Sequence, residues 1–208
     1  MSQGTTALFE PRKTPVQTRS TASVDAILKA TIQVLLKVGK EKLTTTRVAA
    51  RAGVSVGTLY QYFPNKSALL KAVLKQHMTA VVENIERVGR EQRGQPLEDV
   101  VSALMNAYLD AKMREMKASV ALYSVSSDVD GAKVVQEMGV RGNRAIVEML
   151  SEAKERVENV EMVAAMLQGV MNGVSRRLLE SKEPEKQFDA LRAELVFLAC
   201  AYVRARAR

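Results

Sequence analysis

Apolar residues recur at helical spacing along most of this chain, and this pattern constrains the fold more than any other feature. Between residues 24 and 38 they fall three and four positions apart, which places them on one face of an α-helix. The same spacing returns in residues 65–88, 97–116, 159–180 and 184–205. No segment reads as a β-strand. The pattern therefore predicts an all-α protein of about nine helices.

In the N-terminal third, residue types that end a helix are each followed by residue types that start the next one. They are Gly39, Thr44 or Thr45, Gly53, Ser55 and Asn65. Glycine closes a helix in the left-handed conformation, whereas Ser, Thr and Asn side chains accept hydrogen bonds from the first turn of the next helix. The breaks predict two short helices followed by a long one, and residues 89–96 are expected to form a turn after it.

Residues 44–63 have the pattern of a helix-turn-helix, in which two short helices meet at a tight turn. Gly53 is expected to make the turn, and Leu59 and Phe63 are expected to point into the core. The second helix starts with small side chains, which would let it enter the major groove of DNA. These are Ser55, Val56, Gly57 and Thr58.

The charge distribution also favours a nucleic-acid partner. Residues 1–78 hold 12 of the 31 Lys and Arg residues but only three of the 23 acids. The remaining residues are close to neutral, so the net charge of +8 comes from the first third of the chain. A positive field at one end of a molecule attracts a polyanion.

Side-chain chemistry assigns expected roles within this motif. Phosphate contacts are expected from N–H groups and hydroxyls at the helix starts, near Thr45, Thr46 and Ser55. Tyr60, Tyr62 and Lys66 can also reach phosphates. Gln61 can pair with adenine, and Thr58 or Val56 can touch a thymine methyl group. Basic residues of the N-terminal arm, Arg12, Lys13 and Arg19, can follow the DNA backbone or enter the minor groove.

The segment from Arg19 to Lys71 resembles the DNA-binding domain of the TetR family of bacterial repressors. The match runs through Ile27-Leu28, Gly39, Leu43-Thr44-Thr45, Val48-Ala49, Ala52-Gly53-Val54-Ser55, Gly57-Thr58-Leu59-Tyr60, Tyr62-Phe63, Asn65-Lys66 and Leu69-Leu70. The run GTLYQYFPNK is its most specific part. Lys40 departs from the family pattern, which often has an aromatic residue at this position, in the contact between the first two helices.

The resemblance implies a helical homodimer whose N-terminal head binds operator DNA. It implies DNA contacts at the positions of Thr45, Thr46, Ser55, Val56, Gly57, Thr58, Tyr60, Gln61, Tyr62 and Lys66. It also implies a C-terminal region that binds an inducer and dimerises. The expected organisation is a flexible basic arm at 1–20, the helix-turn-helix domain at 21–66 and a regulatory and dimerisation domain at 67–208.

The C-terminal region offers candidates for the dimer interface and for a ligand pocket. A seam at helical spacing and two small residues four apart suggest a dimer interface: Gly169, Gly173, Leu191, Leu195, Leu198 and Tyr202. Adaptable side chains suggest a pocket for a small apolar or amphipathic effector: Met105, Tyr108, Tyr123, Met162 and Met166. The alternative for both sets is the core of a single chain.

Other function classes find little support in the residues. The single His77 and single Cys200 have no partners in sequence for catalysis, and no metal-ligand spacing or phosphate loop is present. We therefore expect no catalytic residues, no cofactor and no metal. The most apolar run, residues 195–203, is too short to cross a membrane. With no signal peptide and one cysteine, a cytoplasmic location is expected.

The leading interpretation is a dimeric transcriptional repressor that leaves its operator when an effector binds. Two alternatives remain open at this stage. One is a DNA-binding regulator without a ligand, which a sealed C-terminal core would favour. The other is a helical enzyme or protein-interaction module whose hairpin no longer contacts DNA.

Overall fold

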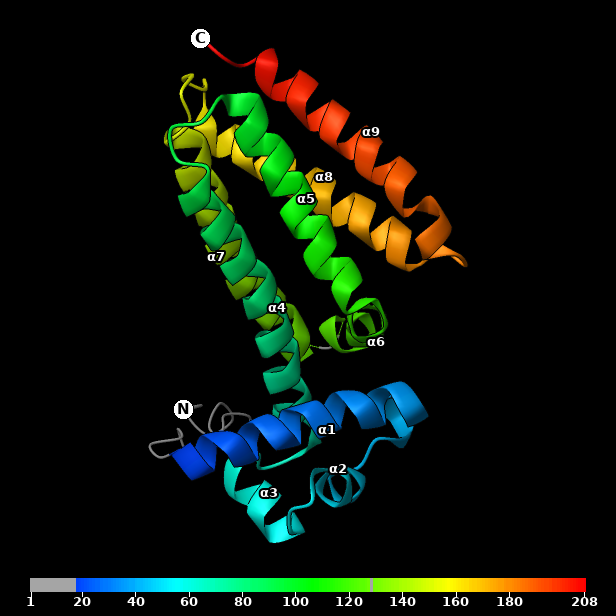
Figure 1. Ribbon diagram of the computed structural model, residues 1–208. Coiled ribbons are helices and arrows are strands. Elements are labelled where there is room, and N and C mark those ends of the chain that lie inside the picture. Colours follow the sequence, from blue (N-terminus) through cyan, green and yellow to red (C-terminus); the bar gives the residue numbers. More distant parts are fainter. Residues whose placement is uncertain (1–17, 128) are drawn as a thin grey trace, which may run out of the picture. The chain divides into compact units, whose positions relative to one another are not determined.

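The computed structural model describes residues 18–127 and 129–208, and these residues form nine helices (Figure 1). The helices are α1 (Thr18–Lys42), α2 (Thr45–Ala52), α3 (Val56–Tyr62), α4 (Lys66–Glu91), α5 (Leu97–Arg114), α6 (Met116–Ser126), α7 (Val129–Ser151), α8 (Val160–Leu179) and α9 (Pro184–Arg204). Within the described ranges the only strand-like pairing is an isolated bridge between Val157 and Ala207. The predicted all-α class is confirmed.

The chain divides into two compact units. The first contains the described residues up to His77 together with residues 121–135, and the second contains residues 78–120 and 136–208. The first unit thus extends past residue 66, where the sequence-based boundary was placed. Helix α1 starts at Thr18, inside the segment predicted as an arm. The side chains of the basic arm, including Arg12, Lys13 and Arg19, lie outside the described residues.

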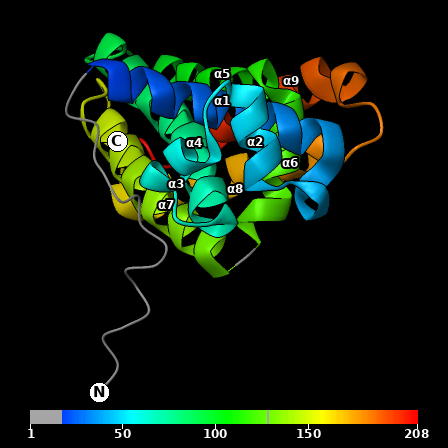
Figure 2. The ribbon, with the colours of Figure 1, turned by 90° about the horizontal axis from the view of Figure 1, so that it is seen from below.

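The first unit is built around the apolar faces of its short helices. Helix α2 packs against both α1 and α3 (Figures 1 and 2). Ile27 of α1, Val48 of α2 and Leu59 of α3 are completely buried. Phe63, directly after α3, is buried as well, so both core positions predicted for the helix-turn-helix are confirmed. Burial of these side chains holds two helices that are too short to be stable alone.

Side-chain caps set the starts of the short helices. The Thr44 hydroxyl accepts a hydrogen bond from the backbone N–H of Arg47 at 3.2 Å, so Thr44 and not Thr45 caps α2. Ser55 caps α3 through the N–H of Thr58 at 2.9 Å. Asn65 likewise accepts from the N–H of Ala68 at the start of α4, at 2.8 Å. Each cap satisfies a donor that the first helical turn leaves free.

The two predicted glycine breaks behave differently. Gly53 adopts the left-handed conformation, with φ of 69° and ψ of 28°, and closes α2 as expected. Gly39 has φ of 75° but ψ of 168°, a region that essentially only glycine occupies. The chain therefore kinks at Gly39 and makes one more turn to Lys42 instead of ending the helix there.

The second unit has a separate core in which α5, α8 and α9 pack against one another (Figure 1). Its most deeply buried side chains come from all three helices and from α7, and include Leu104, Leu109, Ile146, Leu167, Ala199 and Val203. The apolar spacing that predicted α8 and α9 includes buried Leu167 and Leu195, but also the exposed residues Met162, Met166 and Leu198. The helical period therefore identified the elements but not, by itself, the buried face.

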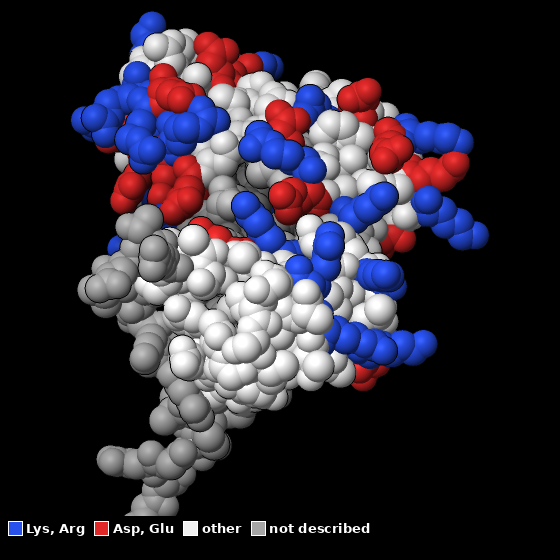
Figure 3. Space-filling model, turned by 60° about the horizontal axis from the view of Figure 1, so that its bottom comes forward, with Lys and Arg blue, Asp and Glu red and all other residues white. Residues whose placement is uncertain are grey.

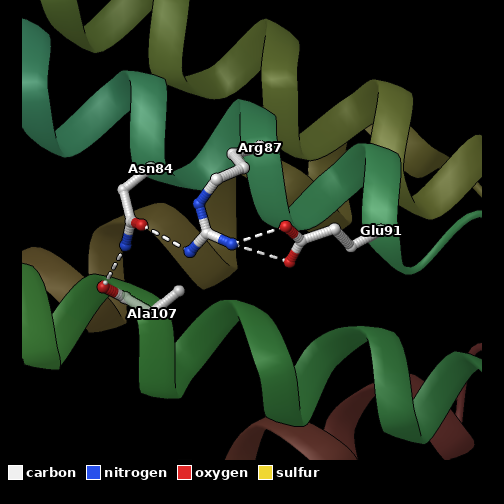
Figure 4. Close-up of polar contacts among 4 residues, drawn as sticks. All are labelled: Asn84, Arg87, Glu91 and Ala107. Atoms are coloured by element: carbon white, nitrogen blue, oxygen red, sulfur yellow. Dashed lines mark hydrogen bonds and ion pairs between the residues drawn. The ribbon is translucent and has the colours of Figure 1, made fainter.

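Helix α4 continues through the first residues of the turn predicted at 89–96. Gly89 lies inside the helix, and a Cβ atom there would approach Cγ of Met149 on α7 to 2.6 Å. On another side of α4, Asn84 donates from Nδ2 to the backbone carbonyl of Ala107 on α5 at 2.9 Å (Figure 4). The Asn84 amide oxygen accepts from Arg87, which also pairs with Glu91. Close packing and this polar contact fix the end of α4.

The described helices contain no segment long and apolar enough to cross a bilayer. Across the same residues, His, Cys, Asp and Glu side chains form no group of three that could hold a metal ion.

Candidate nucleic-acid interface

The predicted DNA-contacting residues gather on the surface of α2 and α3. Eight of the ten surround the starts of these helices or the outer side of α3, and all eight are at least partly exposed: Thr45, Thr46, Ser55, Val56, Gly57, Thr58, Tyr60 and Gln61. Tyr62, at the end of α3, is half-buried. Lys66, at the first turn of α4, is also half-buried, and it is engaged elsewhere in the fold.

A hydrogen bond between two of these residues joins the helices. The hydroxyls of Thr45 and Tyr60 lie 3.0 Å apart, so the first residue of α2 is tied to the outer side of α3. The bond fixes the phenol of Tyr60, which is 40% exposed, beside the N–H groups that open α2. Free N–H groups and a fixed hydroxyl at one helix start suit a phosphate oxygen.

A second bond orients the start of α3. The hydroxyls of Ser55 and Thr58 lie 2.8 Å apart, and Ser55 also caps the helix through the Thr58 N–H. The Thr58 hydroxyl is therefore hydrogen-bonded within the protein. The hydroxyl keeps further hydrogen-bonding capacity and the methyl takes no part in these bonds. The thymine contact predicted for this position stays a prediction.

Two cationic side chains donate hydrogen bonds to the carbonyl groups at the C-terminal end of α1. Lys66 donates from Nζ to the carbonyl oxygens of Lys40 at 2.6 Å and Glu41 at 3.4 Å. Arg47 donates to the carbonyl of Lys42 at 2.6 Å. The last carbonyls of a helix carry partial negative charge and lack partners within it, so both side chains stabilise the end of α1. Lys66 thus has a structural role that its sequence position did not reveal.

Helix α3 contributes no charge to this surface. Helix α3 contains no Lys, Arg, Asp or Glu. Figure 3 shows a broad surface almost free of charged side chains at the end that carries α2 and α3, with Lys and Arg along its edge. Sequence reasoning assigned no role to Arg47 and Arg51 of α2, although it counted their charge. The structure ties Arg51 to Gln33 of α1 at 2.6 Å.

Four of the five residues predicted for a ligand pocket lie in different surroundings, two in the core and two on the surface. Met105 and Tyr108 are buried in the core of the second unit. Met162 and Met166 lie on the opposite side of α8 from its core residues and are about half exposed. The Tyr123 side chain lies outside the described residues. Helical spacing showed that these methionines share a face, but not which face is buried.

The residues predicted for the dimer interface divide between the inside and outside of the chain. Leu195 is only 3% exposed and packs in the core of its own chain, while Leu191 and Tyr202 are half-buried. Gly169, Gly173 and Leu198 are exposed, and a Cβ atom at either glycine would meet open space. Phe197, which the sequence analysis missed, is 71% exposed.

Exposed apolar and small residues lie on both α8 and α9, two helices that pack against each other. On α8, Met162, Met166, Gly169 and Gly173 follow helical spacing along one side, opposite the buried residues of that helix. On α9, Phe197 and Leu198 are exposed. A large exposed apolar patch on a soluble protein usually marks an interaction site. We refer to these six residues as the α8–α9 stripe.

A polar groove of about 500 Å³ lies between α4 and α7 of the second unit. Arg93 pairs with Glu152 and Arg141 pairs with Glu86, in each case through two hydrogen bonds of 2.7–3.0 Å. These pairs neutralise most of the charge that lines the groove. Its floor is formed by Gly89, Ala145 and Met149.

Comparisons with known proteins agree with this geometry. Residues 27–73 match the family described as "Bacterial regulatory proteins, tetR family", and residues 96–202 match "Tetracyclin repressor-like, C-terminal domain". The first match covers the helix-turn-helix, and the second covers about half of the chain.

Individual relatives match over shorter stretches. An HTH-type transcriptional regulator of Staphylococcus aureus is 31% identical over 88 residues, which cover 41% of this chain and 46% of that protein. The HTH-type transcriptional repressor KstR of Rhodococcus jostii is 28% identical over 146 residues, 69% of this chain and 66% of that protein. The chain therefore matches about half to two thirds of the length of these relatives.

A solved structure shares the fold at low identity. The transcriptional regulator FadR of Bacillus subtilis, in complex with stearoyl-CoA, superposes with a TM-score of 0.68 and 18% identity, covering 85% of this chain and 97% of that one.

The Lys66 contacts predict a loss of stability that does not involve DNA. Replacing Lys66 with Met removes the ammonium that bonds the end of α1 and should lower the free energy of unfolding by about 1–2 kcal/mol. Urea titration followed by circular dichroism measures the change. Lys75→Met, at an exposed position of the same helix, is the matched control and should change stability by less than about 0.5 kcal/mol. Equal stability of the two variants would show that the fold does not need the Lys66 ammonium.

Proposed function

The chain belongs to the TetR family of bacterial regulatory proteins, and from this premise we propose that it is a transcriptional repressor that binds a palindromic operator as a homodimer. The proposal includes release from the operator by a small apolar or amphipathic effector. It also includes a cytoplasmic location and the absence of enzymatic activity.

One observation carries the DNA-binding part of the proposal. The starts of α2 and α3 present hydroxyls and free N–H groups on one uncharged surface, with cations at its edge. Such a surface can approach base edges closely, while phosphates bind at the helix starts and near the basic residues. On α3, Gln61 and the Thr58 methyl are the groups that we propose read the sequence.

Dimerisation is supported by the α8–α9 stripe. An aromatic ring that is 71% exposed, next to exposed Leu198, is costly to leave in water. The two glycines of α8 leave room for a helix to approach closely. A two-fold axis through this surface would pair α8 and α9 with their copies in a four-helix bundle. We propose the stripe as the dimer interface, in place of a seam that includes buried Leu195.

The effector part of the proposal rests on the family and on one relative. The FadR structure holds stearoyl-CoA, an amphipathic molecule. In a protein of this fold, an effector weakens DNA binding only to the extent that it prefers the conformation that does not fit the operator. The buried positions of Met105 and Tyr108 are the observation that favours the alternative of a regulator without a ligand.

A negative charge introduced at the start of α2 tests DNA binding without damaging the fold. Thr46 is exposed in the first turn of the helix, where a carboxylate favours the helix but repels phosphates. Thr46→Glu should therefore keep or raise the melting temperature and weaken binding to any duplex at low salt by about tenfold or more. Thr46→Gln, similar in size but uncharged, is the control. Equal duplex affinities for Glu and Gln in a gel-shift titration would remove this helix start from the interface.

A charge placed in the α8–α9 stripe tests the dimer. Phe197→Glu puts an unpaired carboxylate where two copies of the stripe would meet, and burying it there is unfavourable. The wild-type protein should sediment as a dimer and Phe197→Glu as a folded monomer. Glu194→Gln, at an exposed position of the same helix, should remain dimeric. A dimeric Phe197→Glu variant would place the interface elsewhere.

A further inference from the structure

Lys112, near the end of α5, is half-buried. No acidic side chain of the described residues forms an ion pair with its ammonium. Burial is the cause of a lowered pKa for Lys112, from 10.5 to about 8. At neutral pH the side chain therefore still carries its positive charge, in surroundings that disfavour it.

The contacts around Lys112 belong to a polar cluster at the edge of the core of the second unit. The ammonium lies 5.6 Å from the centre of the Tyr108 ring, one helical turn back on α5. The Tyr108 hydroxyl donates to Oδ1 of Asn172 on α8 at 2.9 Å, and it lies 3.0 Å from the hydroxyl of Ser175. The aromatic face offsets part of the cost of burying the charge, but it supplies no anion.

Nearby half-buried arginines of the second unit are paired with acids. Arg192, on α9, pairs with Asp110 of α5, two residues before Lys112. Arg141 pairs with Glu86 on both oxygens. An unpaired charge in the interior lowers stability, and positions of this kind are commonly functional. Lys112 therefore differs from the other cations in the interior of this unit.

We propose that Lys112 is the anchor for an anionic effector, an organic carboxylate with an apolar tail, whose carboxylate pairs with the Lys112 ammonium. This inference rests on the proposed function, because it names the chemical class of the effector and the residue that recognises it. A carboxylate would supply the charge that Lys112 lacks and would recover the energy lost on its burial.

The apolar part of the effector has suitable neighbours. Tyr108 belongs to the apolar core of the second unit, together with Met105 and Leu109 of α5 and Met171 of α8. Methionine side chains adjust to bound ligands at low cost. Met105, Leu109 and Met171 are at most 1% exposed, so a tail with its head at Lys112 would insert between α5 and α8 by displacing these core side chains.

Thermal denaturation with matched probes tests the inference on the full-length protein without DNA. The probes are octanoate, decanoate and dodecanoate below their micelle concentrations, each compared with the alcohol of the same length. At least one carboxylate should raise the melting temperature of the wild-type protein, and the corresponding alcohol should raise it less. Lys112→Met should lose this difference, with carboxylate affinity reduced about ten- to hundredfold.

Two comparisons separate recognition from a structural role. Lys117→Met, which removes an exposed lysine on α6, changes the net charge equally and should respond as the wild type does. Without any probe, Lys112→Met should melt at least about 2 °C higher than the wild type, because it removes an unpaired interior charge. Lys112→Gln serves as a second neutral variant. Lower melting temperatures for both neutral variants would assign Lys112 to the fold and overturn the proposal.

The remaining outcomes are also decisive. Equal shifts with carboxylates and alcohols, or no shift with any of the three carboxylates, would overturn the anionic class of effector. A carboxylate shift that persists in Lys112→Met would overturn the anchor. Gel shifts with the same variants report on the proposed function separately, since Lys112→Met should still bind duplex DNA but should no longer be released by the carboxylate.

Discussion

Burial of the apolar side of α2 and α3 is the interaction on which the rest of the structure depends. Val48, Leu59 and Phe63 anchor two helices of fewer than nine residues each. Their burial leaves the hydroxyl-bearing side outside, and the Thr45–Tyr60 and Ser55–Thr58 bonds then fix the side chains on that surface. The same packing gives the head its stability and its chemistry, because an uncharged surface can come close to base edges.

The second unit shows the reverse of the usual placement of side chains in two places. Apolar residues of the α8–α9 stripe are exposed, whereas the half-buried cation of Lys112 has no acidic partner among the described residues. Each arrangement lowers the stability of an isolated chain. A second copy would cover the stripe, and an anionic ligand would neutralise the lysine, so both costs are consistent with a dimeric, ligand-responsive regulator.

Local features were predictable from the sequence, and long-range ones were not. The caps at Ser55 and Asn65 and the turn at Gly53 depend on neighbours within a few residues, so the residue types alone predicted them. Helical spacing predicted nine helices, but spacing does not say which face meets the core. Met162 and Met166, predicted for a pocket, are exposed and Leu195, predicted for the dimer interface, is buried in its own chain; the pocket and the interface stay predictions. The Lys66 bonds depend on the end of another helix, which no local pattern contains.

Selection of bound duplexes from a random pool by the purified wild-type protein tests the central claim most directly. Two copies of one head related by a two-fold axis must recognise an inverted repeat. We therefore expect the enriched sequences to share two inverted half-sites with a fixed spacing between them. Enrichment of a single unrepeated motif, or no enrichment at low salt, would contradict the account.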